Sequence, residues 1–247
     1  MSDATDPPQR HSRPTDALCA QGGTALEHPV TELPGLFDDS RVCVLTSPVR
    51  DAELATLSER EREMIANAVS KRRNEFATGR HLARLGLARY FGITGFDLLN
   101  AKDRSPQWPV GVSGSIAHSD RRAWVALVDS AIATVGIDGE SRPTLEPNLW
   151  RMILREEEQA YIQRLDPAIR GRRALTIFSA KEALYKAQFP QSRQFMGFMA
   201  LRVELHEGGR LDCHFQTNVG PYRTGFTASG RWLDNGDIVT AVWIATV

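Results

Sequence analysis

The 247-residue chain is short of cysteine, net charge and long apolar runs, and each shortage excludes a class of protein. Its 30 Lys and Arg residues balance 30 Asp and Glu residues, so it lacks the field expected of a general nucleic-acid coat. Cys19, Cys43 and Cys213 form no C-x-x-C pair and leave one cysteine over, which indicates a reduced, cytoplasmic protein. No apolar run approaches the roughly 18 residues of a membrane span, and the acidic, proline-containing start is unlike a signal peptide. We therefore expect a protein in solution in the cytoplasm, with neither nucleic acid nor membrane as a partner.

The composition is otherwise typical of a folded globular protein, with 42% hydrophobic and 24% charged residues. At about 100 to 200 residues per domain, the length suits one large domain or two small ones. Residues 1–34 are rich in Pro, Asp, Gly, Thr and Ser and show no sustained periodicity. They are predicted to form a mobile N-terminal tail whose last stretch can dock on the folded part.

The order of the expected helices and strands favours an α+β fold. A strand is expected at 41–45, and a long helix opens at Ser58, where Glu61 completes a capping box, and ends at Gly92. Strands over 110–116, 123–128 and 132–138 follow, then helices over 150–165 and 172–187 and further strands to the C-terminus. Helices and strands do not alternate strictly, so we expect two similar lobes that meet near residues 135–142. A single continuous sheet fits the same pattern.

Two acidic residues end one of the expected strands. Asp138 and Glu140 are two positions apart, so in an extended chain both carboxylates point to the same side. Such hard oxygen donors form half of a Mg²⁺ site, and Gly139 between them allows close approach to the backbone. The alternative is a pair of ordinary acidic residues where a strand enters solvent.

A second acidic residue of interest lies on the expected helix 172–187. Glu182 is followed at i+4 by Lys186, so a carboxylate and an ammonium group share one helical face. They form either a surface ion pair or a functional pair, in which the carboxylate faces a metal or a proton and the ammonium faces a phosphate.

The first long helix carries a basic stripe. Arg72, Phe76 and Arg80 recur at i, i+4 and i+8, and two guanidinium groups on one face would hold a phosphate monoester; the alternative is a solvated face. His118 follows a β-like run and precedes a polar turn, a place where a lone histidine is more often structural. The other histidines show no metal-ligand spacing, which argues against zinc and against a Cys–His nucleophile.

These features occur together in one order along the chain. The motifs are KRRNEF at 71–76 with GRH at 79–81, WP at 108–109, GSIAH at 114–118, VGIDGE at 135–140 and FSAKE at 178–182 with YK at 185–186. Together they resemble the signature of the 4′-phosphopantetheinyl transferases. The resemblance is closest to the two-lobed Sfp-type group, with its enterobactin-synthetase-like and actinobacterial members, and it covers residues 41–198.

The resemblance implies a fold and a reaction. The fold is a pair of similar, pseudo-two-fold related lobes, residues 35–136 and 137–247, with the active site between them. The reaction moves the phosphopantetheine arm of coenzyme A, with Mg²⁺, onto a serine of an apo acyl or peptidyl carrier protein and releases adenosine 3′,5′-bisphosphate. Such carriers serve polyketide, nonribosomal-peptide, siderophore or fatty-acid synthesis. Because two lobes of one chain complete the site, a monomer is favoured.

The resemblance also implies roles for individual residues. The metal ligands would be Asp138, Glu140 and Glu182. Glu182 would accept the serine proton, directly or through a metal-bound water, and Lys186 would stabilise the leaving diphosphate oxygen or protonate it. The coenzyme A contacts would be Arg72, Arg80, Arg104, Ser115, His118, Lys181 and Lys186, with Lys181 at the diphosphate.

Two positions depart from the family pattern. Ala117 stands where relatives usually have Ser or Thr, and Gly139 replaces a larger residue between the two acids. The first removes a hydroxyl contact to the ligand, and the second is expected to loosen the metal site. These departures leave open a different function, namely a non-catalytic module that binds coenzyme A or a carrier protein.

Overall fold

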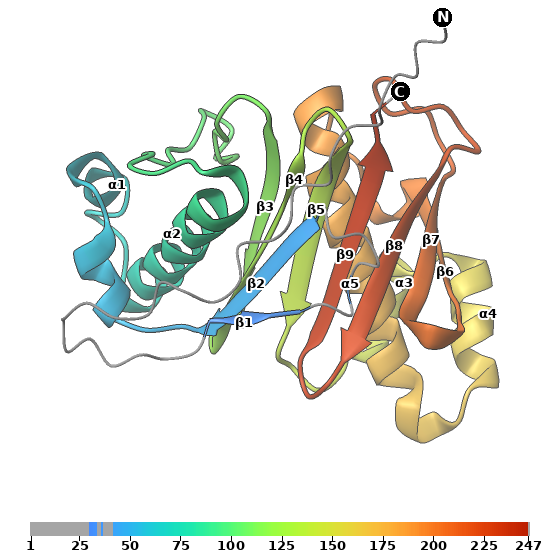
Figure 1. Ribbon diagram of the computed structural model, residues 1–247. Coiled ribbons are helices and arrows are strands. Elements are labelled where there is room, and N and C mark those ends of the chain that lie inside the picture. The colour runs from blue at the N-terminus through green and yellow to red at the C-terminus, as the bar shows by residue number, and fades with distance from the viewer. Residues whose placement is uncertain (1–29, 34–35, 37–41, 247) are drawn as a thin grey trace, which may run out of the picture.

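Two antiparallel sheets, each covered by a long helix, make up two lobes that lie side by side (Figure 1). The computed structural model describes residues 30–33, 36 and 42–246. The prediction of a mobile tail at 1–34 falls largely outside these residues. Within them, Thr31–Glu32 forms a short strand, β1, which pairs antiparallel with β2, Val42–Pro48. The α+β class is confirmed.

The N-terminal lobe packs one helix against a four-stranded sheet of order β1-β2-β4-β3, in which β3 is Val112–His118 and β4 is Arg122–Asp129. Helix α2, Ser70–Phe91, buries Leu82, Ala83 and Leu87 against apolar side chains of β2 and β4. A Cβ at Gly86 would lie 2.5 Å from a methyl of Leu127, so this glycine allows the helix to approach the sheet closely. The helix ends at Gly92, where φ is 66°.

The expected helix from Ser58 to Gly92 is interrupted. After a 3₁₀ turn, Ala52–Thr56, helix α1 covers only Glu59–Glu63, although its predicted capping box between Ser58 and Glu61 is confirmed. The chain turns through 64–69 before α2 begins, which brings Ile65 into a small core with Leu57, Phe76 and Ala77. Val69 precedes the first helical residue of α2 and is 73% exposed.

The C-terminal lobe contains a five-stranded sheet of order β5-β9-β8-β7-β6. Its strands are β5 Ala133–Glu140, β6 Leu201–Leu205, β7 Arg210–Phe215, β8 Thr227–Asp234 and β9 Ile238–Ala245. The helices are α3 Pro147–Ile153, α4 Glu156–Arg164 and α5 Pro167–Ser192, with 3₁₀ turns at Phe198–Ala200 and Glu207–Gly209. The helix expected at 150–165 is therefore two helices, α3 and α4. The carboxylate of Glu158 accepts a hydrogen bond from the N–H of Arg155 and so caps the start of α4. Since all of β5 belongs to this sheet, the chain changes lobe in the turn 130–132, ahead of the boundary expected after residue 136.

Serine hydroxyls join the two sheets where β3 and β5 run next to each other. The hydroxyl of Ser113 accepts a hydrogen bond of 3.2 Å from the N–H of Val135, and that of Ser115 accepts one of 3.1 Å from Ile137. A core that includes Trp124 of β4 with Val135 and Ile137 of β5 continues across the boundary. The lobes are thus two sheets linked by side chains, rather than the single sheet that the sequence also allowed.

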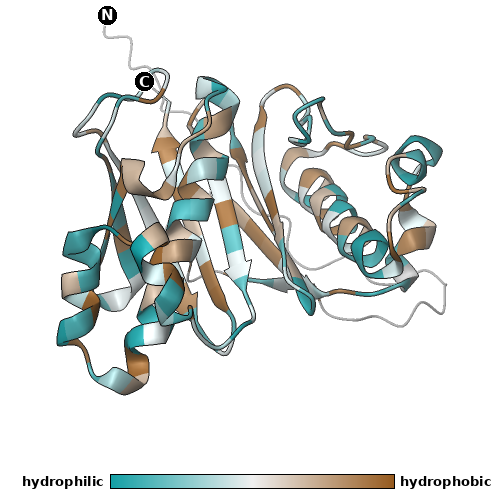
Figure 2. Cartoon of the chain, turned by 180° about the vertical axis from the view of Figure 1, so that it is seen from behind, coloured by the Kyte–Doolittle hydropathy of each residue, from teal (hydrophilic) through white to brown (hydrophobic). Residues whose placement is uncertain are grey.

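The distribution of apolar residues agrees with this layering. Figure 2 shows hydrophobic residues along the strands of both sheets and hydrophobic and hydrophilic residues mixed along the helices. Among the described residues, none of the helices combines the length and hydropathy that a membrane-spanning segment requires.

Candidate active site

The candidate site lies where β5 of the C-terminal lobe packs on α5. A Cβ at Gly136 would lie 1.9 Å from the carbonyl oxygen of Ala183, so the backbones of strand and helix are in direct contact there. Asp138 and Glu140 follow Gly136 at every second position and share its face of the strand. The residue that precedes Ala183 on α5 is Glu182, which is thereby brought to the two acids of β5.

Charged groups of both signs interact at this contact. The ammonium group of Lys186 donates to Asp138 Oδ1 at 2.8 Å and to the carbonyl of Ile137 at 3.0 Å. Burial raises the pKa of Glu182, and the carboxylates of Asp138 and Glu140 raise it further, while Lys186 opposes them. Glu182 therefore holds a proton more readily than an ordinary glutamate, a property expected of a general base.

One carboxylate oxygen among these acids has no hydrogen-bond partner. Asp138 is 8% exposed, and its Oδ2 is buried without a hydrogen-bond partner. Glu140 is engaged elsewhere, because Arg142 donates to both of its carboxylate oxygens at 2.8 Å. Within the described ranges, no group of three His, Cys, Asp or Glu side chains is arranged to hold a metal ion. The oxygen donors have the chemistry that Mg²⁺ prefers, and Arg142 occupies the donors that Glu140 would supply.

A basic group from the N-terminal lobe faces these acids. His118, at the end of β3, has its Nε2 against Nη1 of Arg72 and its Nδ1 3.3 Å from Glu75 Oε2. Burial and the Arg72 guanidinium lower the pKa of His118, Glu75 opposes them, and weaker effects come from Lys186 and Asp138. His118 thus lies within electrostatic range of the site on the other lobe.

Two residues of this region were not proposed as site residues from the sequence. Glu75 contacts both His118 and Arg72. Its position three residues after Arg72 on a helix is the sequence feature from which its contact with Arg72 could have been predicted. Arg142 lies two residues after Glu140, which in an extended chain places both on the same side.

Arg80 and Arg104, two of the expected coenzyme A contacts, differ in accessibility. Arg80 is 4% exposed and donates to the carbonyl of Leu98 at 2.8 Å and to Asn100 Oδ1 at 2.5 Å. Its guanidinium also lies over the ring of Phe76, 4.2 Å from the ring centroid, and burial lowers its pKa to about 10. The basic stripe predicted to bind a phosphate is therefore not available at Arg80, because this side chain points into the N-terminal lobe and its donors are used there. Arg104 is exposed, as is Arg72.

Ser115 and Lys181 are enclosed in the protein. Ser115 is 5% exposed, and its hydroxyl is used by β5 as described above. The ammonium group of Lys181 is fully buried and donates to Glu158 at 2.7 Å and to the carbonyls of Ile153 and Phe198 at 2.8 and 3.1 Å. The structure therefore does not place Lys181 where a diphosphate could reach it, because all of its donors are used within the C-terminal lobe.

The small residue between the two acids has a packing partner. A Cβ at Gly139 would lie 2.4 Å from Cε3 of Trp124, whose buried ring occupies that space. The tryptophan fills the volume that a larger residue would take, and the expectation that Gly139 loosens the metal site stays a prediction.

This arrangement defines a class of protein. Acids and a lysine meet where β5 packs on α5, and His118 of the N-terminal lobe, in contact with the exposed Arg72, lies within electrostatic range of them. Such a combination of charges suits a transferase that acts on a phosphorylated substrate. Comparison with known proteins makes the class specific. A family model described as the 4′-phosphopantetheinyl transferase N-terminal domain matches residues 60–128, and that of the 4′-phosphopantetheinyl transferase superfamily matches residues 134–242.

Individual relatives agree with the family models. The 4′-phosphopantetheinyl transferase PptT of Mycobacterium tuberculosis is 34% identical over 194 residues, 74% of this chain and 83% of the relative. Npt of Nocardia iowensis is 33% identical over 218 residues, 81% and 97% of the two chains. Svp of Streptomyces mobaraensis is 34% identical over 206 residues, 79% and 81%. The chain therefore belongs to the 4′-phosphopantetheinyl transferases, enzymes that transfer the phosphopantetheine arm of coenzyme A to carrier proteins.

Proposed function

We propose that the chain carries out this transfer with Mg²⁺ at the contact between β5 and α5, and that the acceptor is a serine of an apo acyl or peptidyl carrier protein. The observation that carries the proposal is the meeting of Asp138, Glu182 and Lys186, with one buried carboxylate oxygen left without a partner. Asp138, Glu140 and Glu182 would hold the metal, which neutralises charge on the diphosphate.

Glu182 is proposed as the base. Its raised pKa favours uptake of the serine proton, and the neighbouring Lys186 supplies a positive charge on the same helical face. Lys186 would turn from Asp138 toward the diphosphate oxygen that leaves with the nucleotide, and stabilise or protonate it. Both residues lie one turn apart on the same helix, so their backbone positions stay fixed relative to each other while the Lys186 side chain turns.

The N-terminal lobe would bind the nucleotide end of coenzyme A. Arg72 and His118 are in contact, and with the exposed Arg104 they offer donors to the 3′-phosphate or the diphosphate. The enzyme would act as a monomer, because both lobes of the site come from one chain. Its place would be the cytoplasm, as the cysteine content indicates.

The test is a transfer assay with purified protein, coenzyme A, Mg²⁺ and a panel of apo carriers, read by mass spectrometry. We expect the mass of the phosphopantetheine arm on at least one carrier and loss of transfer in Glu182→Gln, with an unchanged thermal melt. Wild-type turnover by Glu182→Gln would show that another group takes the proton. Tight coenzyme A binding without transfer to any carrier, under every metal tried, would instead favour a non-catalytic binding module.

A further inference from the structure

The loop that joins α2 to β3 is held at its base by an arginine of its own lobe. Arg80 binds the carbonyl of Leu98 and the side chain of Asn100, at the point where the loop leaves the lobe. Backbone hydrogen bonds of 2.8 Å from Ala101 to Ser105 and from Gln107 to Leu99 fold the segment into a hairpin-like loop. Asp103 and Arg104 lie at its tip.

The tip is held by an arginine of the other lobe. Nη1 of Arg193, the residue that caps the C-terminus of α5, lies 3.0 Å from Asp103 Oδ2. The other carboxylate oxygen accepts hydrogen bonds from the N–H and the hydroxyl of Ser105 at 3.0 and 2.5 Å, which orients the carboxylate. The guanidinium of Arg193 also lies 5.9 Å from the ring centroid of Phe189 on α5. An ion pair with defined partners on both sides therefore connects the loop to the C-terminal lobe.

The ion pair lies close to the proposed catalytic residues. Tyr185, one turn from Phe189 on α5, stacks on that ring with a centroid distance of 5.6 Å. Burial raises the pKa of Tyr185, and the carboxylates of Glu182 and Asp103 both add to the effect, so the same phenol is near the site and near the loop tip. The tip of the loop thus stands at the edge of the site.

The backbone on both sides of the ion pair needs support. Arg104 has φ of 69° and Arg193 has φ of 52°, and in the described part of the chain they are the only non-glycine residues with positive φ. Such left-handed conformations are costly for residues with a Cβ and persist where contacts hold them. The N–H of Arg104 donates to the carbonyl of Ala101 at 2.9 Å, and the ion pair of the adjacent Asp103 is a second contact that holds this part of the loop.

We propose that Asp103 and Arg193 form a latch between the lobes that positions Arg104 for the nucleotide end of coenzyme A, an inference that rests on the proposed function. Arg193 and the buried Arg80 are then positioning residues, one at each end of the loop. When the latch is broken, Arg104 loses its fixed place, whereas Glu182 and Lys186 remain on α5. Coenzyme A binding is weakened more than the chemical step.

The test compares Asp103→Asn, Arg193→Gln and the double variant, with coenzyme A affinity measured by calorimetry and KM and kcat by the transfer assay. Each single change is expected to weaken coenzyme A binding about threefold to fivefold, which corresponds to losing most of the free energy that an exposed ion pair contributes. The KM for coenzyme A rises in parallel, and kcat changes less. The double variant binds no more weakly than either single variant, and Arg193→Lys recovers part of the affinity because the charge is kept.

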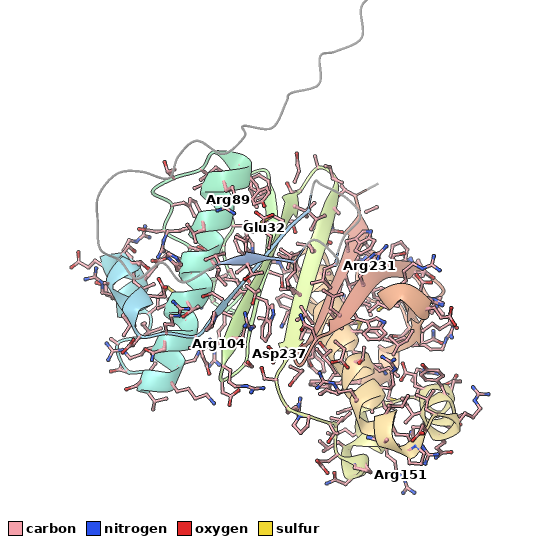
Figure 3. The ribbon with its side chains drawn as sticks, turned by 60° about the horizontal axis from the view of Figure 1, so that its bottom comes forward. Glu32, Arg89, Arg104, Arg151, Arg231 and Asp237 are labelled. Carbon is pink, nitrogen blue, oxygen red and sulfur yellow. The ribbon has the colours of Figure 1, made fainter. Side chains whose placement is uncertain are left out.

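A matched control is Arg89→Gln, which breaks an exposed ion pair of 2.9 Å with Glu32. Figure 3 shows this pair at the opposite end of α2 from Arg104. The control is expected to leave coenzyme A affinity unchanged. Unchanged affinity in Asp103→Asn and Arg193→Gln, additive losses in the double variant, or a fall in kcat alone would each overturn the latch. Wild-type protein that neither binds coenzyme A nor modifies any carrier would refute the proposed function instead.

Discussion

Replacing Lys181 by methionine tests whether this lysine supports the fold or touches the substrate. The change keeps most of the side-chain stem and removes the ammonium group. The side chains of Lys181 and of its partner Glu158 are 0% and 2% exposed. Glu158 would retain backbone donors at Arg155 and Val203, both at 2.7 Å, but its charge would have no counter-ion. The carbonyls of Ile153 and Phe198 would also lose their donor.

The expected loss is large. Removing one partner of a buried ion pair costs about 3 to 5 kcal/mol, and for a domain of this size that corresponds to a fall in Tm of about 6 to 20 °C. Glu158→Gln in the same chain should recover part of the loss, because it removes the unpaired charge. Differential scanning calorimetry measures both changes.

Coenzyme A affinity separates the two roles of Lys181. The folded Lys181→Met variant should bind coenzyme A as the wild type does, since the ammonium group faces the core. Lys186→Met is the matched control on the same helix, where the side chain is 28% exposed. It should lose transfer with a smaller change in Tm. A Lys181→Met protein with wild-type Tm and weakened coenzyme A binding would refute the structural role.

Three further predictions concern the site itself. Gly136→Ala forces a Cβ against the backbone of α5 at Ala183. The variant should lose at least the ~1 to 3 kcal/mol of stability typical of an overpacked core, and it should lose transfer activity. A variant that melts and transfers like the wild type would contradict this prediction. Arg142→Gln frees Glu140, so the dissociation constant for Mn²⁺, followed by electron paramagnetic resonance, should fall about threefold to fivefold, and a rise would count against a metal at Glu140. Burial and Arg72 lower the pKa of His118, so it is neutral in the free enzyme at neutral pH, and a bound phosphate would raise that pKa. Coenzyme A binding should therefore take up protons and strengthen as pH falls toward the lowered pKa of His118. Calorimetry in buffers of different ionisation enthalpy measures the uptake, and its persistence in a His118→Gln protein would contradict the assignment.

Local patterns in the sequence were enough for several features. The capping box at Ser58 and Glu61 depends on residues three apart, and the shared face of Asp138 and Glu140 follows from the two-residue period of a strand. The α+β class follows from the order of the elements. Each of these depends on neighbours along the chain, whose geometry is nearly independent of the rest of the fold.

Features that depend on contacts between distant segments could not be predicted from the sequence and are decided by the tertiary structure. Lys181 and Lys186 are five residues apart and therefore about 140° apart around a helix, so one faces the core when the other faces the site, but the pattern does not say which. The packing of α5 places Glu158 against Lys181 and β5 beside Lys186. The ring of Trp124 fills the space above Gly139 for the same reason. Burial is a property of the assembled lobes, and it separates residues that the sequence alone groups together.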